Sequence, residues 1–255
     1  MKPNLWSGLF VALVASASLV MFLWPLVLTS QDANQSTIAQ ALFIALMPTL
    51  LVLLLVEYTS GKLDSRRLAI LGVLISINAV IRLLGAGVSG IETAFFLIVI
   101  GGYVFGSGFG FILGAGSLLV SALLGAGVGP WLPFQMMAAG LVGIGAGALH
   151  KVTSKQPLVL MSLYGVVSSF AYGALMTMWN WPYLAGLGSS LSFVPGAPMT
   201  ENLVQFFRYE LLTGGLAWDL GRAVTTVALI CLTGKTLLAT LNRAANRAVF
   251  DESAN

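Results

Sequence analysis

The chain has 255 residues, of which 58% are hydrophobic and only 8% are charged, and its formal net charge is +3. Soluble domains carry about a quarter charged residues, so this composition indicates an integral membrane protein rather than a soluble domain. The lysines and arginines lie between apolar runs, where positive charge sets membrane topology, and they therefore do not indicate nucleic-acid binding. A single cysteine, Cys231, excludes an internal disulfide and any multi-cysteine metal site.

Apolar runs long enough to cross a bilayer, about 20 residues each, recur along the chain. The N-terminal run is longer than the apolar region of a signal peptide and has no clear cleavage site after it, which predicts a retained transmembrane helix. The fold class expected is therefore an all-α integral membrane protein. Its eight predicted spans are 5–28, 39–57, 68–84, 93–106, 108–125, 132–149, 157–178 and 215–238.

Residues 94–125 form one apolar run that is too long for a single span. As one helix it would measure about 48 Å, against about 30 Å for the hydrocarbon core. The stretch FGSGFG at 105–110 is predicted to break it, because glycine accepts turns. With this break, the lysines and arginines that flank the spans fall on one side, which predicts that both termini are cytoplasmic. Glycines recur every fourth residue from Gly102 to Gly114 and predict close helix packing.

The stretch GAGVGPWLPFQMMAAG at 125–140 predicts a tight outer turn followed by a helix. Pro133 suits the first turn of that helix, where its missing N–H is not needed. Gln135 then faces inward about one turn below the outer surface, offers two donors and an acceptor, and has no partner nearby in sequence. It is the first candidate for substrate binding. Trp131, at the same mouth, is either a membrane anchor or a ligand contact.

The linker at 179–214 is the longest in the chain, and a loop of this length in a compact protein usually serves as a lid or binding element. Residues 201–212 are predicted to form a short amphipathic helix within it. Its apolar side would consist of Leu203, Phe206, Phe207 and Leu211. The linker begins with WNWPY, which either anchors at the membrane or holds a flat ligand ring. In the second case the candidates are Trp179, Asn180, Trp181 and Tyr183.

Charged residues gather toward the predicted outer side, and charges within a membrane usually face a cavity or a partner. Arg82, Asp219 and Arg222 are candidates for substrate binding, and the two arginines could hold a carboxylate, a phosphate or polar ring oxygens. The alternative is internal ion pairing, of Arg82 with Glu92 and of Arg222 with Asp219, which is placed at i, i+3. Asn78, one turn before Arg82, is either a pocket residue or an interhelical hydrogen-bond partner.

Catalytic chemistry is not expected. The one histidine, His150, has no acid or base beside it apart from Lys151 at a helix end. The stretch GFGFILGAG at 108–116 lacks the preceding strand and following acidic residue of a dinucleotide site, and also the Lys-Ser/Thr of a P-loop. No catalytic residue, metal site or cofactor is therefore predicted, which leaves transport or binding.

Four stretches together carry a family resemblance. They are INAVIRLLGAGVSGIET at 77–93, GYVFGSGFGFILGA at 102–115, GVGPWLPFQM at 127–136 and GLAWDLGRAV at 215–224. In sequence, order and spacing they resemble the S components, the substrate-specific membrane subunits, of energy-coupling-factor (ECF) vitamin transporters. The resemblance implies a six-helix core in the plasma membrane that binds a vitamin near the outer face. It also implies partners, namely a membrane T component and two cytoplasmic ATPases that drive uptake.

The chain departs from this family pattern in two respects. Two extra spans precede the core, so the expected division is 1–60 for these helices, 61–248 for the core with 179–214 as its lid, and 249–255 for a cytoplasmic tail. Many S components dock on the T component through an Ala-xxx-Ala face of the first core helix. The nearest equivalent is Gly72 and Ser76, for which docking and packing within the chain are both open.

The substrate is less well determined than the family. A large, lidded, polar-rimmed mouth favours a corrinoid such as cobalamin or a precursor, whereas the aromatic residues equally suit riboflavin or thiamine. A self-sufficient secondary transporter is the alternative function, but it would need a polar midplane path, often built from paired repeats, and no such repeat is visible. A membrane enzyme is disfavoured by the missing catalytic groups.

Overall fold

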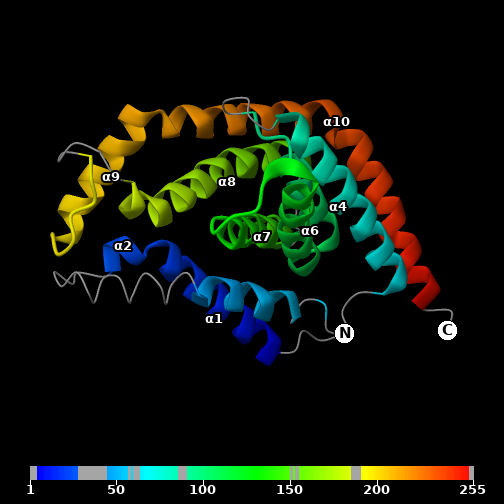
Figure 1. Cartoon of the computed structure of the whole chain (residues 1–255). Coiled ribbons are helices and arrows are strands. Elements are labelled where there is room, and N and C mark those ends of the chain that lie inside the picture. The colour runs from blue at the N-terminus through cyan, green and yellow to red at the C-terminus, as the bar shows by residue number, and fades with distance from the viewer. Residues whose placement is uncertain are drawn as a thin grey trace.

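The computed structural model describes residues 5–27, 45–56, 59, 64–85, 91–149, 152, 155–184 and 191–252. Within these ranges every regular element is a helix, as the sequence predicts (Figure 1). His150, the linker after the first span, and residues 253–255 of the predicted tail lie outside the described residues. So do residues 185–190 of the predicted lid.

The helices follow the predicted spans in order. They are α1 (Leu5–Phe22), α2 (Trp24–Val27), an apolar helix over Ala45–Val56, α4 (Ser65–Gly85), α5 (Phe95–Phe105), α6 (Ser107–Ser121), the π-helical turn η1 (Ala122–Ala126), α7 (Leu132–Leu149), α8 (Pro157–Asn180), the 3-10 turn η2 (Trp181–Tyr183), α9 (Met199–Thr213) and α10 (Gly215–Glu252). In the described part of the chain, five helices are long and apolar enough to cross a membrane, and three shorter apolar helices match the remaining spans. The chain is a multi-pass membrane protein.

The predicted break of the long apolar run is confirmed at Gly106. This residue ends α5 and precedes α6 with φ +93°, a backbone conformation that favours glycine. The break leaves α5 with 11 residues, a length of about 16 Å, so this helix alone is shorter than the hydrocarbon core.

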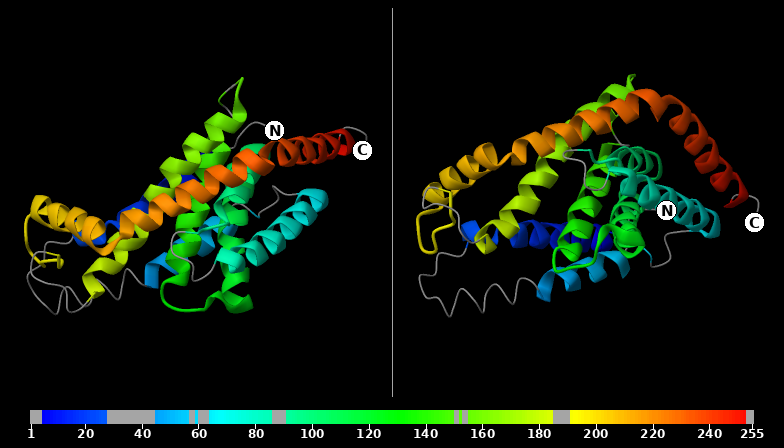
Figure 2. Two further views of the ribbon diagram at one scale, coloured as in Figure 1. Left: turned by 90° about the horizontal axis from the view of Figure 1, so that it is seen from above. Right: turned by 45° about the horizontal axis from the view of Figure 1, so that its top comes forward.

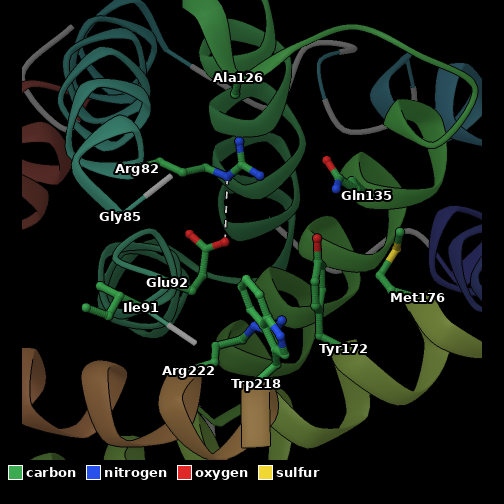
Figure 3. A pocket seen from close by; sticks show the side chains of 10 residues that line it. All are labelled: Arg82, Gly85, Ile91, Glu92, Ala126, Gln135, Tyr172, Met176, Trp218 and Arg222. Carbon is green, nitrogen blue, oxygen red and sulfur yellow. Dashed lines mark ion pairs between the residues drawn. The ribbon is translucent and has the colours of Figure 1, made fainter. Parts of the chain in front are cut away.

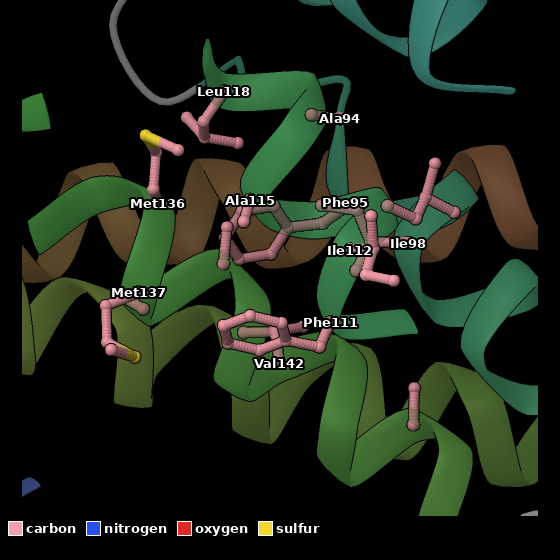
Figure 4. Packing of buried hydrophobic residues seen from close by; sticks show 14 of the residues in the cluster. Ala94, Phe95, Ile98, Phe111, Ile112, Ala115, Leu118, Met136, Met137 and Val142 are labelled. Atoms are coloured by element: carbon pink, nitrogen blue, oxygen red, sulfur yellow. The ribbon is translucent and has the colours of Figure 1, made fainter. Parts of the chain in front are cut away.

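Glycines bring α5, α6 and α7 into backbone contact, as their spacing predicts. Gly110 and Gly143 face each other so closely that a Cβ on either would overlap the carbonyl group of the other. A Cβ on Gly102 would lie 2.8 Å from the carbonyl oxygen of Gly143, and Gly114 lies against the backbone of Ala139. Buried apolar side chains surround these contacts and complete the core (Figure 4).

The last helix is longer than predicted. The expected span ends at 238, but α10 has 38 residues and continues to Glu252, so it includes residues 249–252 of the predicted cytoplasmic tail. Its length of about 57 Å exceeds the hydrocarbon thickness, and Figure 1 shows that α10 bends toward its red C-terminal part. The helix continues because residues 236–249 contain neither glycine nor proline to end it.

Helix α9 confirms the short helix predicted within the lid, but its buried side is not the predicted apolar side. Of the four apolar residues on the predicted side, only Phe206 is buried, and Leu203, Phe207 and Leu211 are exposed. The buried side is mainly polar and consists of Asn202, Gln205, Phe206 and Glu210. Asn202 tolerates burial because its amide exchanges two hydrogen bonds of 3.0 Å with the backbone of Val194.

The N-terminal helices pack onto the outside of the core. α1 contacts α7 and α8, and α2 contacts α8 and α9. The right-hand view of Figure 2 shows the blue N-terminal helices alongside the green core. The contact is aromatic: Phe22 lies edge-on to Phe134 at 5.7 Å, and Trp24 Nε1 donates to the carbonyl oxygen of Trp179 at 3.3 Å.

Candidate functional site

A cavity of about 340 Å³ opens between four helices and the segment before α5 (Figure 3). Its polar side chains point toward one another from α4, α7, α8 and α10. The cavity is lined by Arg82, Gly85, Ile91, Glu92, Ala126, Gln135, Tyr172, Met176, Trp218 and Arg222. Its volume lies near the lower end of the range for small-molecule pockets, roughly 300–1,000 Å³.

The end of α4 and the segment before α5 form one wall. Thr93 Oγ1 donates to the carbonyl oxygen of Ile81 at 2.7 Å, and the absence of a side chain on Gly85 lets the backbone of Ile91 approach. These contacts bring Glu92 to Arg82, with Nε and Oε2 3.7 Å apart. Arg82 also donates from Nη1 to Ser121 Oγ at 2.9 Å, so its guanidinium is held from two sides.

Arg222 is held on the opposite wall, and the predicted pair with Asp219 is present. Arg222 Nη1 also donates to the carbonyl oxygen of Ser169 at 3.0 Å, and the guanidinium lies over the ring of Tyr172, 4.9 Å from its centroid. The Asp219 carboxylate is buried directly against Gly173, where any Cβ would overlap it. Both ion pairs that the sequence left as alternatives are thus formed.

Gln135 reaches the cavity from the first turn of α7, on the opposite side from Arg82 (Figure 3). The turn before it requires glycine, because Gly125 and Gly127 have φ of +137° and +94°. The Gln135 N–H donates to the carbonyl oxygen of Trp131 at 2.9 Å, which starts the helix with the Gln135 side chain turned inward.

The tryptophans expected at the site do not line the cavity. Trp131 is 42% exposed and lies over Gly129. Trp179 is buried and stacks on Phe134, so the ring face that a ligand would need is already covered. Trp181 is fully buried in a separate cluster with Met178 and Phe206, where its Nε1 donates to the carbonyl oxygen of Leu191 at 2.8 Å.

The remaining residues of the same cluster also lie away from the cavity lining. Tyr183 is partly exposed beside Trp24 and Trp179, and Asn180, which is partly buried, ends α8. Asn78 is fully buried, and within the described ranges neither its amide nitrogen nor its oxygen has a hydrogen-bond partner. Neither role expected for Asn78, pocket contact or interhelical bond, is visible in its surroundings.

Gly72 and Ser76 lie on the outward face of α4. Both are exposed, and a Cβ on Gly72 would meet nothing within 4 Å. Ser76 Oγ donates to the carbonyl oxygen of Gly72 at 2.9 Å, within the helix. Among the described residues, no other element covers this small-residue face.

Several lining residues were not identified from the sequence as site residues, above all Tyr172, Met176 and Trp218. Tyr172 and Met176 are four residues apart and share one face of α8. Trp218 directly precedes Asp219 within the stretch GLAWDLGRAV, so its position in that stretch was the available signal.

Helix α9 touches this region through Glu210, which is 4% exposed. Burial is the main cause that raises the pKa of the Glu210 carboxyl, and the negative charge of Asp219 raises this pKa further. A hydrogen bond with Thr177 and the positive charge of Arg222 lower the same pKa, but by less. Gly214, at φ +87°, joins α9 to α10, and Gly215 has no side chain where the Glu210 carboxylate packs. The predicted lid is thereby connected to the wall that holds Arg222.

Comparison with known proteins gives one match. The family model for the substrate-specific component of ECF transporters matches residues 66–238. This range contains every residue that lines the cavity, and it begins after the two N-terminal apolar helices. Neither the curated proteins nor the solved structures include a match to the chain.

Proposed function

Because the chain belongs to the family of substrate-specific components of ECF transporters, we propose that its cavity captures a vitamin or related micronutrient for uptake. Members of this family are transport subunits rather than enzymes. The observation that carries the proposal is the convergence of Arg82, Gln135 and Arg222 on one cavity from three helices. These are the residues we propose to bind the substrate, since each presents hydrogen-bonding groups to a partly enclosed space.

The partners proposed are a membrane T component and two cytoplasmic ATPases that supply the energy. The exposed face of α4 around Gly72 and Ser76 supports a docking role, because small residues let another helix approach closely. Neighbouring exposed side chains on α4, such as Val73 and Val80, would then contact the T component or lipid.

The size of the cavity bears on the substrate. A volume of about 340 Å³ suits a compact molecule better than a corrinoid, whose ring system and attached groups demand far more space. The expectation of cobalamin therefore loses support, and a more compact vitamin is favoured. Riboflavin, with its longer side chain, would have to extend through the mouth.

The topology proposed places both termini in the cytoplasm and the cavity mouth outside. The cations at the start of α4, Arg66 and Arg67, support this orientation, because positive residues favour the cytoplasmic side. We retain the division into two N-terminal helices (1–60) and a six-helix core (61–248), with 179–214 as a lid over the outer end.

The proposal is tested by purifying the full chain from its native membrane and identifying its bound protein and small-molecule partners by mass spectrometry. The expected result is a T component, two ATPases and one vitamin-like compound. Gln135→Ala should retain the protein partners and lose the compound. Gly72→Leu should retain the compound and lose the protein partners. Uptake by the chain alone, driven by an ion gradient, would instead establish a secondary transporter.

A further inference from the structure

The cavity contains balanced charge. Its two guanidiniums each have a carboxylate of their own: Glu92 for Arg82 and Asp219 for Arg222. A third carboxyl group, Glu210, lies buried beside Gly215 and Asp219, and it provides no attraction for an anion. An incoming anion would therefore find no uncompensated cation among the described residues around the cavity, and it would also lie close to Glu92, which lines the same space.

Hydrogen-bonding capacity, in contrast, remains available in both directions. The guanidiniums of Arg82 and Arg222 line the cavity, although their Nε atoms are buried and have no hydrogen-bond partner in the described part of the chain. Gln135 offers both donors and an acceptor, and the Tyr172 hydroxyl points toward the cavity centre (Figure 3). Glu92 can accept a hydrogen bond from a ligand N–H through oxygens that make only long contacts, 3.3 Å to Ala94 N and 3.7 Å to Arg82 Nε.

Apolar surface completes the lining and limits the ligand's size. Trp218 is 47% exposed and presents its ring beside Arg222, and Met176 lies across from it near Gln135 (Figure 3). A ring or short carbon skeleton can lie against these side chains while its polar edges reach the arginines, Gln135 and Glu92.

We propose that the cavity selects a compact ligand without net charge, either uncharged or zwitterionic, and rejects phosphate esters and other anions. This inference concerns the same cavity as the proposed function and rests on it. It adds a rule of selection: each arginine is neutralised by its own carboxylate, so that the ligand is recognised by donors and acceptors rather than by charge.

Inorganic phosphate is the probe, titrated into the purified full chain in detergent at neutral pH with calorimetry as the readout. We expect no binding to the wild type. Glu92→Gln frees Arg82 from its carboxylate and should gain phosphate binding, at least about tenfold tighter than the weakest affinity that the titration can detect. The double variant Arg82→Gln/Glu92→Gln is the matched control, because it restores the balance of charge and should lose that binding.

Phosphate binding by the wild type would overturn the inference, and so would a failure of a folded Glu92→Gln to gain any. Should Glu92→Gln not fold, the compound that co-purifies with the wild type decides: zero net charge at neutral pH by capillary electrophoresis supports the inference, and an anion contradicts it. An anionic vitamin would leave the proposed function standing. If no ATPases co-purify with the chain, the proposed function is refuted. The phosphate titration would still decide whether the cavity rejects anions.

Discussion

The rings of Phe134 and Trp179 stack nearly parallel, with centroids 4.0 Å apart and 6° between their planes. This pair joins the first turn of α7 to the last turn of α8. Phe22 of α1 closes the stack from the edge, and Phe134 directly precedes Gln135. The N-terminal helices, which lie outside the range of the family match, thereby support the wall that carries a proposed substrate-binding residue.

Replacing Phe22 by alanine should loosen this wall. We expect a lower melting temperature and a loss of ligand affinity on the order of 1 kcal/mol, because the stack transmits the change to Gln135. Phe10→Ala, on an exposed part of the same helix, is the matched control and should change neither property. Thermal unfolding in detergent and titration with the co-purified compound provide the measurements. Wild-type affinity in Phe22→Ala would show that α1 plays no part in shaping the cavity.

The contact of Gly110 with Gly143 makes a strong prediction about stability. A methyl group on Gly143 would overlap backbone atoms of α6, so Gly143→Ala should destabilise the fold by about 1–3 kcal/mol. Gly72→Ala places the same methyl group in open space on α4 and should leave stability unchanged or slightly raised. The melting temperatures of the two variants in one detergent give the comparison. Equal values would contradict the close approach of α6 and α7.

Gln135 and Trp131 lie four residues apart, but Gln135 lines the cavity and Trp131 lies at the exposed surface. Gln135→Ala should weaken ligand binding about tenfold or more, since the ligand loses hydrogen bonds in a partly enclosed site. Trp131→Ala should bind nearly as well as the wild type, because Trp131 lies outside the cavity lining. Calorimetric titration of both purified variants checks the pair. A larger loss of ligand affinity in Trp131→Ala than in Gln135→Ala would show that Trp131 contacts the ligand.

Glu210 should make stability depend on pH. Burial raises the pKa of its carboxyl above the ordinary value near 4.5, so the folded state binds this proton more tightly than the unfolded state. Its contribution is therefore most favourable at low pH and is lost as pH rises from the ordinary value through the raised one. Glu210→Gln removes the ionisation, and we expect a higher melting temperature than the wild type at neutral pH.

The same variant should gain little or nothing at pH below about 4, where the wild-type carboxyl is protonated in both states. Thermal melts from about pH 4 to neutral pH isolate the effect of burial, with Glu201→Gln, at an exposed position of the same helix, as the control. A gain for Glu210→Gln that is independent of pH would refute this account.

Features that are local in the sequence were predicted well. The spans, the break at Gly106 and the short helix in the lid follow from apolar run length, glycine conformation and periodicity. The pairing of Asp219 with Arg222 follows from one turn of helix, and the pairing of Arg82 with Glu92 was named as an alternative. These features depend on neighbouring residues or on a scarcity of charge that leaves few possible partners.

Which faces turn inward could not be predicted in the same way. Lipid-facing and buried residues of a membrane helix are both apolar, so hydropathy does not distinguish them. The aromatic residues after Trp179 are suitable in type for a ligand site, yet Phe134 and the cluster around Trp181 occupy their faces. Burial of the polar side of α9 likewise depends on a partner eight residues away, the backbone of Val194.

By itself the sequence determined a polytopic helical membrane protein, its order of spans and its resemblance to the S components, because composition and run length are properties of the chain alone. Only the tertiary structure decided which side chains share the cavity, that Arg82 pairs with Glu92, and that no described element covers the face around Gly72. The physical reason is that these properties arise from contacts between helices, whose rotation about their axes is set by the backbone approach of Gly110 and Gly143 and by packing elsewhere in the core.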